Sequence, residues 1–145
     1  MSSRTTTLKT VTALKDAGED FEFYPSTDEI IDTVTRHLVD VAEGQYGRTH
    51  SIMDIGAGDG RVLKRFQERL KERAPHRDTV KLYAIEKAVT HQSNMPKDIT
   101  IIGTEFYQQT LVDKQVDVIF CNPPYSEFTA WMLRIVRECC AGDVY

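Results

Sequence analysis

Residues 50–60 read HSIMDIGAGDG, a short apolar run that breaks into three glycines at every second position. Apolar residues then recur at helical spacing from Val62 to Leu70. Glycines let the backbone turn tightly and approach a ligand, and the N–H groups that open the next helix face the same point. This order therefore predicts a strand, a ligand-binding turn and a helix.

Three further stretches have the composition of buried strands, and helical patterns separate them. They are residues 81–85, 100–102 and 116–121. Strands that alternate with helices indicate an α/β fold with a doubly wound, mainly parallel, Rossmann-like sheet of about four strands. Residues 142–145 resemble a turn that enters a fifth strand.

Helical spacing also predicts two helices before the first strand and one after the last. The first covers residues 5–17 and stops at Gly18, and the second begins near Ser26, which has capping-box spacing to Glu29, and ends at Gly44. The expected apolar face of the second helix consists of Ile30, Ile31, Val34, Leu38 and Val41. That of the last helix consists of Phe128, Trp131, Met132, Ile135, Val136 and Cys139.

The polar turn after residues 116–121 is the first candidate for chemistry. It reads Asn122-Pro123-Pro124-Tyr125 and lies at the carboxyl end of a strand, where open α/β sheets bind ligands. Two prolines stiffen it, so the Asn122 side-chain oxygen and the Pro123 carbonyl could together accept both hydrogens of an exocyclic amine. Tyr125 could stack on a planar ring. The alternative is a proline-rich turn whose tyrosine covers the core.

Two other strand ends carry acidic residues. Glu86 follows residues 81–85, where a carboxylate can accept hydrogen bonds from ribose hydroxyls, or it is a surface residue that begins a helix. Glu105 and Phe106 follow residues 100–102, where a carboxylate and a ring could meet the amino group and face of a base. Phe106 could equally belong to the core.

Composition limits the classes of function. The 145 residues suit one domain, and 41% apolar residues suffice for a core. A net charge of −4 and a pI near 5.5 argue against binding nucleic acid through bulk charge. Basic residues do gather between Arg61 and Arg77, either as a stripe facing nucleic acid or, as we favour, as the solvated face of a helix.

The remaining composition points to an intracellular setting. The three cysteines lack CxxC spacing and the four histidines are scattered, so we expect neither a metal site nor disulfides. No run of 18 apolar residues and no apolar signal segment is present, so we expect no membrane contact and a cytoplasmic location.

Taken together, these motifs resemble the class I S-adenosylmethionine-dependent methyltransferases, and among them the Asn-Pro-Pro-Tyr amino-methyltransferases that act on adenine in DNA. The glycine loop resembles their cofactor loop, and residues 23–27 resemble their N-terminal element. The resemblance implies S-adenosylmethionine contacts by Tyr24, Pro25, Ser26, Thr27, Asp54, Gly56, Ala57, Gly58, Gly60, Glu86, Glu105, Phe106 and Asn122. It implies catalytic roles for Asn122, Pro123, Pro124 and Tyr125, and no metal.

The resemblance implies methyl transfer to the N6 amine of adenine, with DNA as the partner. The same tetrapeptide also occurs in methyltransferases that act on protein glutamine or on ribosomal RNA base amines, so RNA or protein substrates stay open. A non-catalytic S-adenosylmethionine-binding module is a further alternative.

The family's sheet has more strands than this sequence shows. We therefore expect an N-terminal extension with a short helix at residues 1–20 and a partial methyltransferase domain at residues 21–145, without the C-terminal strands and the target-recognition region. The strand at 116–121 would then be an exposed edge that favours self-association into a homo-oligomer.

Overall fold

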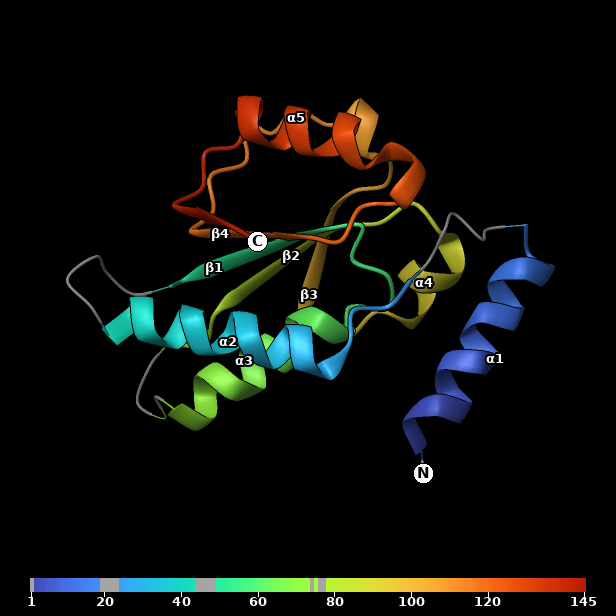
Figure 1. Cartoon of the computed structure of the whole chain (residues 1–145), viewed down its shortest axis with the longest axis horizontal. Coiled ribbons are helices and arrows are strands. Elements are labelled where there is room, and N and C mark those ends of the chain that lie inside the picture. Colours follow the sequence, from blue (N-terminus) through green and yellow to red (C-terminus); the bar gives the residue numbers. More distant parts are fainter. Residues whose placement is uncertain (1, 19–23, 44–48, 74, 76–77) are drawn as a thin grey trace.

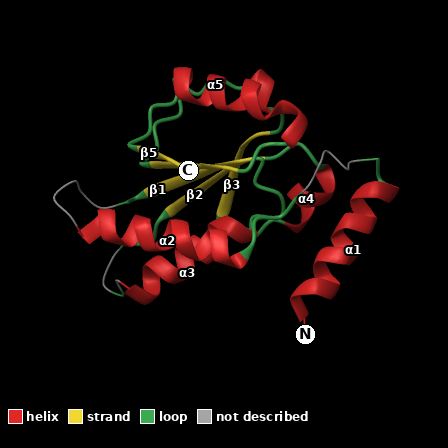
Figure 2. Ribbon diagram, in the orientation of Figure 1, coloured by secondary structure: helices red, strands yellow, loops and turns green. Residues whose placement is uncertain are grey.

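The computed structural model describes residues 2–18, 24–43, 49–73, 75 and 78–145 as a five-stranded sheet between helices (Figures 1 and 2). Its helices are α1 (Ser2–Asp16), α2 (Asp28–Glu43), α3 (Arg61–Arg73), α4 (Val89–Asn94) and α5 (Phe128–Glu138), with 3-10 turns η1 (Phe106–Gln108) and η2 (Tyr125–Glu127). Its strands are β1 (Ser51–Ile55), β2 (Lys81–Ile85), β3 (Ile99–Gly103), β4 (Val118–Cys121) and β5 (Asp143–Val144).

The sheet is parallel throughout, in the order β3-β2-β1-β4-β5. The chain builds outward from β1 to β2 and β3 and then returns to the other side of β1 with β4. The strand order therefore reverses between β1 and β4, and open α/β sheets bind ligands at the carboxyl ends of such strands. The predicted doubly wound fold is confirmed.

Helices cover both faces of the sheet: α2 and α3 lie on one face and α5 lies on the other (Figure 1). Successive strand residues point to opposite faces, so Phe120 joins the core under α2 and α3, where its ring meets Phe66 at 5.4 Å, whereas Ile119 joins the core under α5. The sheet therefore packs between two apolar layers, one on each of its faces. None of the described helices is both long and apolar enough to cross a membrane.

The predicted exposed edge at residues 116–121 is wrong. The short strand β5 pairs with β4 in parallel, with Val118 opposite Asp143 and Ile119 opposite Val144. The Tyr145 backbone extends the pairing, because its N–H donates to the Ile119 carbonyl and its carbonyl accepts from the Cys121 N–H, each at 2.9 Å. This strand pairing removes the argument for self-association through β4.

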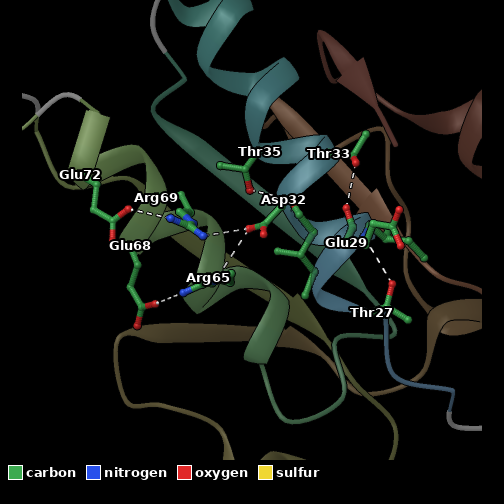
Figure 3. Close-up of polar contacts among 11 residues, drawn as sticks. Thr27, Glu29, Asp32, Thr33, Thr35, Arg65, Glu68, Arg69 and Glu72 are labelled. Carbon is green, nitrogen blue, oxygen red and sulfur yellow. Dashed lines mark hydrogen bonds and ion pairs between the residues drawn. The ribbon is translucent and has the colours of Figure 1, made fainter. Parts of the chain in front are cut away.

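Helix α2 begins one residue later than its capping pattern indicated. The Thr27 hydroxyl, rather than that of Ser26, accepts the Ile30 N–H at 3.4 Å (Figure 3). Ile30 was expected in the core, but its side chain is 50% exposed. The helix instead buries the polar residue Thr35, which was not expected in the core. Thr35 tolerates burial because its hydroxyl donates to the Ile31 carbonyl at 2.7 Å. The expected end at Gly44 lies outside the described residues, as do Phe23 and the Val41 side chain.

The apolar face of α5 is narrower than predicted. Trp131 and Ile135 are buried, whereas Phe128 is 53% and Val136 69% exposed. Only the α5 residues that pack on the sheet lie on the predicted apolar face.

The first helix, α1, ends near the predicted glycine, and Gly18 takes a left-handed φ of 66°.

The basic residues of α3 form a solvated face with acidic neighbours. Arg65 and Arg69 both approach Asp32 of α2, and each also pairs with a glutamate of its own helix (Figure 3). Lys64 pairs with Asp98 at 2.7 Å. Because acidic side chains neutralise Lys64, Arg65 and Arg69, these three residues do not form a free basic stripe.

Candidate functional site

A cavity of about 380 Å³ opens at the carboxyl ends of β1, β2 and β4, at the reversal of strand order. This volume lies within the usual range for small-molecule sites. Of the residues predicted to act, those that line it are Tyr24, Pro25, Ser26, Asp54, Gly56, Ala57, Glu86, Glu105, Phe106, Asn122 and Pro124. The cavity does not include Thr27, Gly58, Gly60, Pro123 and Tyr125.

The glycine loop forms the wall that follows β1. Gly56, Gly58 and Gly60 have φ values of 80°, 56° and 79°, a left-handed region that other residues rarely adopt. A Cβ on Gly56 would lie 3.4 Å from the Trp131 ring, and one on Gly60 would lie 2.6 Å from Ile99. Gly60 is thus required by packing against β3, whereas Gly56 is required where the backbone bends beside the cavity.

Glu86 connects the end of β2 to the glycine loop. One carboxylate oxygen accepts the Gly58 N–H and the other accepts the Ala88 N–H, each at 2.7 Å. Burial raises the pKa of Glu86, and these two N–H donors act in the opposite direction. The predicted alternative of a surface carboxylate is wrong, because Glu86 is buried and lines the cavity.

Asp54 is a buried carboxylate on β1. Its side chain lines the cavity, and its Oδ1 atom has no hydrogen-bond partner among the residues that the structure describes. Burial raises the pKa of Asp54 well above its usual value, and the neighbouring Glu86 raises it further. A buried acceptor without a protein partner is the feature expected of a group that binds a ligand donor.

The two residues after β3 have different surroundings. Glu105 pairs with Lys87 at 2.9 Å, and both side chains line the cavity. Phe106 is buried in the core, where its ring lies 4.5 Å from that of Trp131 and where Arg134 covers it at 5.1 Å. Phe106 therefore belongs to the core and to the cavity wall at once.

The segment before α2 forms the opposite wall. Tyr24, Pro25 and Ser26 line the cavity, whereas Thr27 caps the helix instead. The Arg61 guanidinium donates to the Ser26 carbonyl. Its position at the start of α3 lets it fasten this segment to the end of the glycine loop.

The Asn-Pro-Pro-Tyr turn forms the mouth of the cavity. Asn122 is exposed, and its Nδ2 atom donates to the Tyr24 carbonyl at 2.7 Å. Pro123 is buried, and Tyr125 is 72% exposed with its ring 5.2 Å from that of Tyr24. The alternative in which Tyr125 covers the core is wrong, because both tyrosine rings lie at the surface.

Sequence patterns missed the part of the site that α5 supplies. Trp131 lines the cavity, and its indole N–H donates to Glu127 at 2.8 Å. Glu127 also lines the cavity. The sequence placed Trp131 on an apolar helix face, and only the packing of α5 against Gly56 brings it to the cavity. In the described part of the chain, no cluster of three histidine, cysteine or acidic residues could hold a metal ion.

The chain matches a known protein family. The family model described as "Methyltransferase small domain" covers residues 26–142, which include every cavity residue except Tyr24 and Pro25. No curated protein matches the sequence.

Solved structures share the fold at low identity. Two crystal structures of the plantazolicin methyltransferase BpumL, each in complex with a desmethylPZN analogue and SAH, are 16% and 17% identical, with TM-scores of 0.55 and 0.56. They cover 90% of this chain, which in turn spans 48% of theirs, about half their length. A SAM-dependent methyltransferase from Thiobacillus denitrificans, in complex with S-adenosyl-L-homocysteine, is 14% identical over 80% of this chain and 46% of its own, with a TM-score of 0.48. The BpumL likeness confirms a Rossmann-like class I fold.

Proposed function

Because the chain belongs to the methyltransferase small domain family, we propose that it binds S-adenosylmethionine and transfers the methyl group to a planar, conjugated nitrogen. The acceptor that we propose first is the N6 amine of adenine in DNA. The observation that carries this proposal is that Asp54, Glu86 and Asn122, from the ends of three strands, line one cavity.

The cavity residues fit the cofactor. The buried Oδ1 of Asp54 is an acceptor for the ammonium of the methionine part. The Glu86 carboxylate has lone pairs beyond those that its two N–H donors use, so it can also accept from ribose hydroxyls. Two buried carboxylates favour a cationic ligand, and such a ligand relieves the cost of burying them. Glu105, Phe106 and Trp131 also line the cavity, and their carboxylate and rings suit a purine.

When bound by Asp54, Glu86 and the glycine loop, S-adenosylmethionine would supply an electrophilic methyl group, and S-adenosylhomocysteine would leave after transfer. Asn122 positions the amine that receives the methyl group. Its Nδ2 atom donates to the Tyr24 carbonyl, so its Oδ1 atom remains available to accept a hydrogen bond from that amine. Oδ1 would accept one hydrogen of the amine and help to direct the nitrogen lone pair to the methyl group. The Pro123 carbonyl, the second acceptor that the sequence suggested, belongs to a buried residue that does not line the cavity. The nitrogen releases one proton to water after transfer. Catalysis is then mainly positioning and electrostatic stabilisation.

Adenine suits this mouth in shape. Tyr125 and Tyr24 expose their rings beside Asn122, so a flipped base can stack there while its amine reaches the Asn122 Oδ1 atom. Planar ring and exocyclic amine are thus recognised by different groups of the same turn. This stacking arrangement supports a nucleobase as the acceptor.

A second candidate is methyl transfer to a glutamine side chain in a protein, and the charge distribution favours it. On α3, Lys64, Arg65 and Arg69 pair with Asp98, Asp32 and glutamates of the same helix, and the chain has a net charge of −4. Phosphate backbones bind through clustered unpaired cations. A glutamine amide is also a planar, conjugated nitrogen and requires no such surface.

Calorimetry tests the cofactor site first. Titration of S-adenosylmethionine into the 145-residue chain should give saturable heat. Gly58→Val should abolish it, because valine is strained at a φ of 56° and the Gly58 N–H must reach Glu86. Equal heats from both proteins would refute the cofactor site.

Radiolabelled cofactor then identifies the acceptor. Incubation with DNA, ribosomal RNA and a glutamine-containing protein should label DNA, and label in protein alone would replace the adenine proposal with the glutamine proposal. Asn122→Ala should still bind cofactor, because Asp54 and Glu86 remain in the cavity, but it should transfer the methyl group about 100-fold more slowly. The matched control is Asn94→Ala, because Asn94 only donates to the Thr90 carbonyl within α4. Binding without any transfer would indicate the non-catalytic module.

A further inference from the structure

The segment from Tyr24 to Ser26 is hydrogen-bonded at both of its ends to parts of the site. At one end the Tyr24 carbonyl accepts from Asn122 Nδ2, and at the other the Ser26 carbonyl accepts from Arg61. Pro25 lies between them, and proline restricts its own φ and the backbone of the residue before it. Pro25 therefore removes one of the backbone torsions that relate the two carbonyls, and the hydrogen bonds at both ends restrain the others.

The Asn122 amide needs such a partner to act as proposed. The terminal torsion of asparagine is broad and roughly two-fold, so an exposed amide can turn over and exchange its oxygen and nitrogen. After such a turn, the side-chain N–H groups of Asn122 would face the N–H groups of the amine that receives the methyl group. The Tyr24 carbonyl accepts hydrogen bonds only, and it therefore selects the orientation in which nitrogen faces the protein and oxygen faces the substrate.

Arg61 holds the segment from Tyr24 to Ser26 from its position at the start of helix α3. It is the first residue of α3, directly after the glycine loop, and its own N–H donates to the Asp59 side chain at 3.2 Å. It therefore connects the cofactor loop to the segment that orients Asn122.

We propose that Arg61 is a positioning residue for methyl transfer: through the Ser26 carbonyl it holds the Tyr24 carbonyl where that carbonyl fixes the orientation of the Asn122 amide. The proposal deepens the proposed function, since it concerns the same acceptor site. Its structural part does not depend on any substrate.

Selective isotope labelling tests that structural part without cofactor or substrate. The sequence contains two asparagines, Asn94 and Asn122, so labelled asparagine gives two side-chain amide signals in a nuclear magnetic resonance spectrum. In Arg61→Met, which keeps the apolar stem but loses the donors, the Asn122 signal should shift toward that of a free amide. The Asn94 signal should stay and serve as the internal standard.

Lys64→Met is the matched control, because Lys64 lies one turn further along α3 and pairs with Asp98 instead. It should leave both amide signals in place. An Asn122 signal that does not move in Arg61→Met overturns the proposal. Should Arg61→Met fail to fold, Arg61→Leu gives the same comparison.

Turnover on the acceptor found by radiolabelling provides the second readout. Arg61→Met should lower kcat about 10- to 100-fold, and in the Asn122→Ala background it should cause no further loss. An equal loss in both backgrounds overturns the proposal, because Arg61 would then act independently of Asn122. If no acceptor is methylated, the proposed function fails, while the amide signals still decide the positioning role.

Discussion

Glu86 holds Gly58: the glutamate at the end of β2 accepts the N–H of the central glycine in the loop after β1, at 2.7 Å. This buried side chain adds to the backbone hydrogen bonds by which the Gly56 and Ala57 N–H groups donate to the Ile85 carbonyl. The other carboxylate oxygen holds the Ala88 N–H before α4. The cavity floor is therefore a hydrogen-bonded unit rather than a set of separate loops.

Glu86→Ala should loosen this floor. The Gly58 and Ala88 amides should lose protection against hydrogen exchange, whereas the Gly60 amide, which donates to Ala57, should keep it. Each unpaired buried amide costs about 1–3 kcal/mol, and urea unfolding measures the total. The control is Glu68→Ala, which removes only an exposed ion pair with Arg65. Unchanged exchange at Gly58 would contradict the structure.

Asp54 predicts a specific pH dependence of stability without cofactor. Burial raises its native pKa, whereas in the unfolded chain it titrates at about 3.9. At pH values between these two pKa values, the native state binds more protons than the unfolded state. The contribution of Asp54 to the free energy of unfolding is therefore fully present below pH about 4, and it is lost as pH rises through the raised native pKa. The stability of wild type relative to Asp54→Asn should therefore fall with rising pH. Urea unfolding of both proteins across a pH series measures this difference, and a rise would contradict it.

Cofactor binding should depend on pH in the opposite direction. The ammonium of S-adenosylmethionine pairs with ionised Asp54, so affinity should increase as pH rises through the raised native pKa. Asp54→Asn should bind more weakly and lose this dependence. Calorimetry at several pH values measures it, and an affinity that falls as Asp54 ionises would contradict the assigned role.

Trp131 should report binding directly, because it is the single tryptophan of the chain and lines the cavity against Gly56. Addition of S-adenosylmethionine should change its fluorescence with the same saturation curve as the calorimetric heat. Trp131→Phe should remove the signal. Saturable heat with unchanged emission would place the cofactor away from this wall.

Asp117 should stabilise the start of the sheet. Its Oδ2 atom accepts the His50 N–H, the Ser51 N–H and the Ser51 hydroxyl, at 2.7, 2.8 and 3.0 Å. Asp117→Ala should lower the free energy of unfolding by about 2 kcal/mol. Urea unfolding measures the loss, and Asp113→Ala, which breaks only an ion pair with Lys114 beside it in sequence, is the control. Equal stability of the two variants would contradict the role of Asp117.

Local patterns in the sequence predicted the elements that lie at the centre of the fold. The strand at residues 81–85 has the predicted bounds, and the strand at 51–55 begins one residue after the predicted run. Helix α3 begins one residue before the predicted pattern of Val62 to Leu70 and ends three residues after it. An apolar run buried on both sides and a helix with one apolar face are recognisable from neighbouring residues alone. The glycine loop was recognisable for the same reason.

Features that depend on contacts between residues far apart in the sequence were either not predicted or predicted wrongly. Strand β5 has two residues, and its pairing with β4 shows only when the chain returns to that edge. Thr27 caps α2 in place of Ser26, whose carbonyl is held by Arg61. Likewise, helical spacing could not show that Ile30 and Phe128 lie beyond the region that the sheet covers.

The sequence by itself determined the parallel α/β sheet, the glycine bend and the polar turn of Asn122, because each depends on the backbone preferences and burial pattern of adjacent residues. Only the tertiary structure decided that Trp131 meets Gly56, that Glu86 binds the loop and that Tyr24 orients Asn122. These contacts join residues on different elements. Their geometry follows from how the helices and loops pack against the strand ends, which no local pattern encodes.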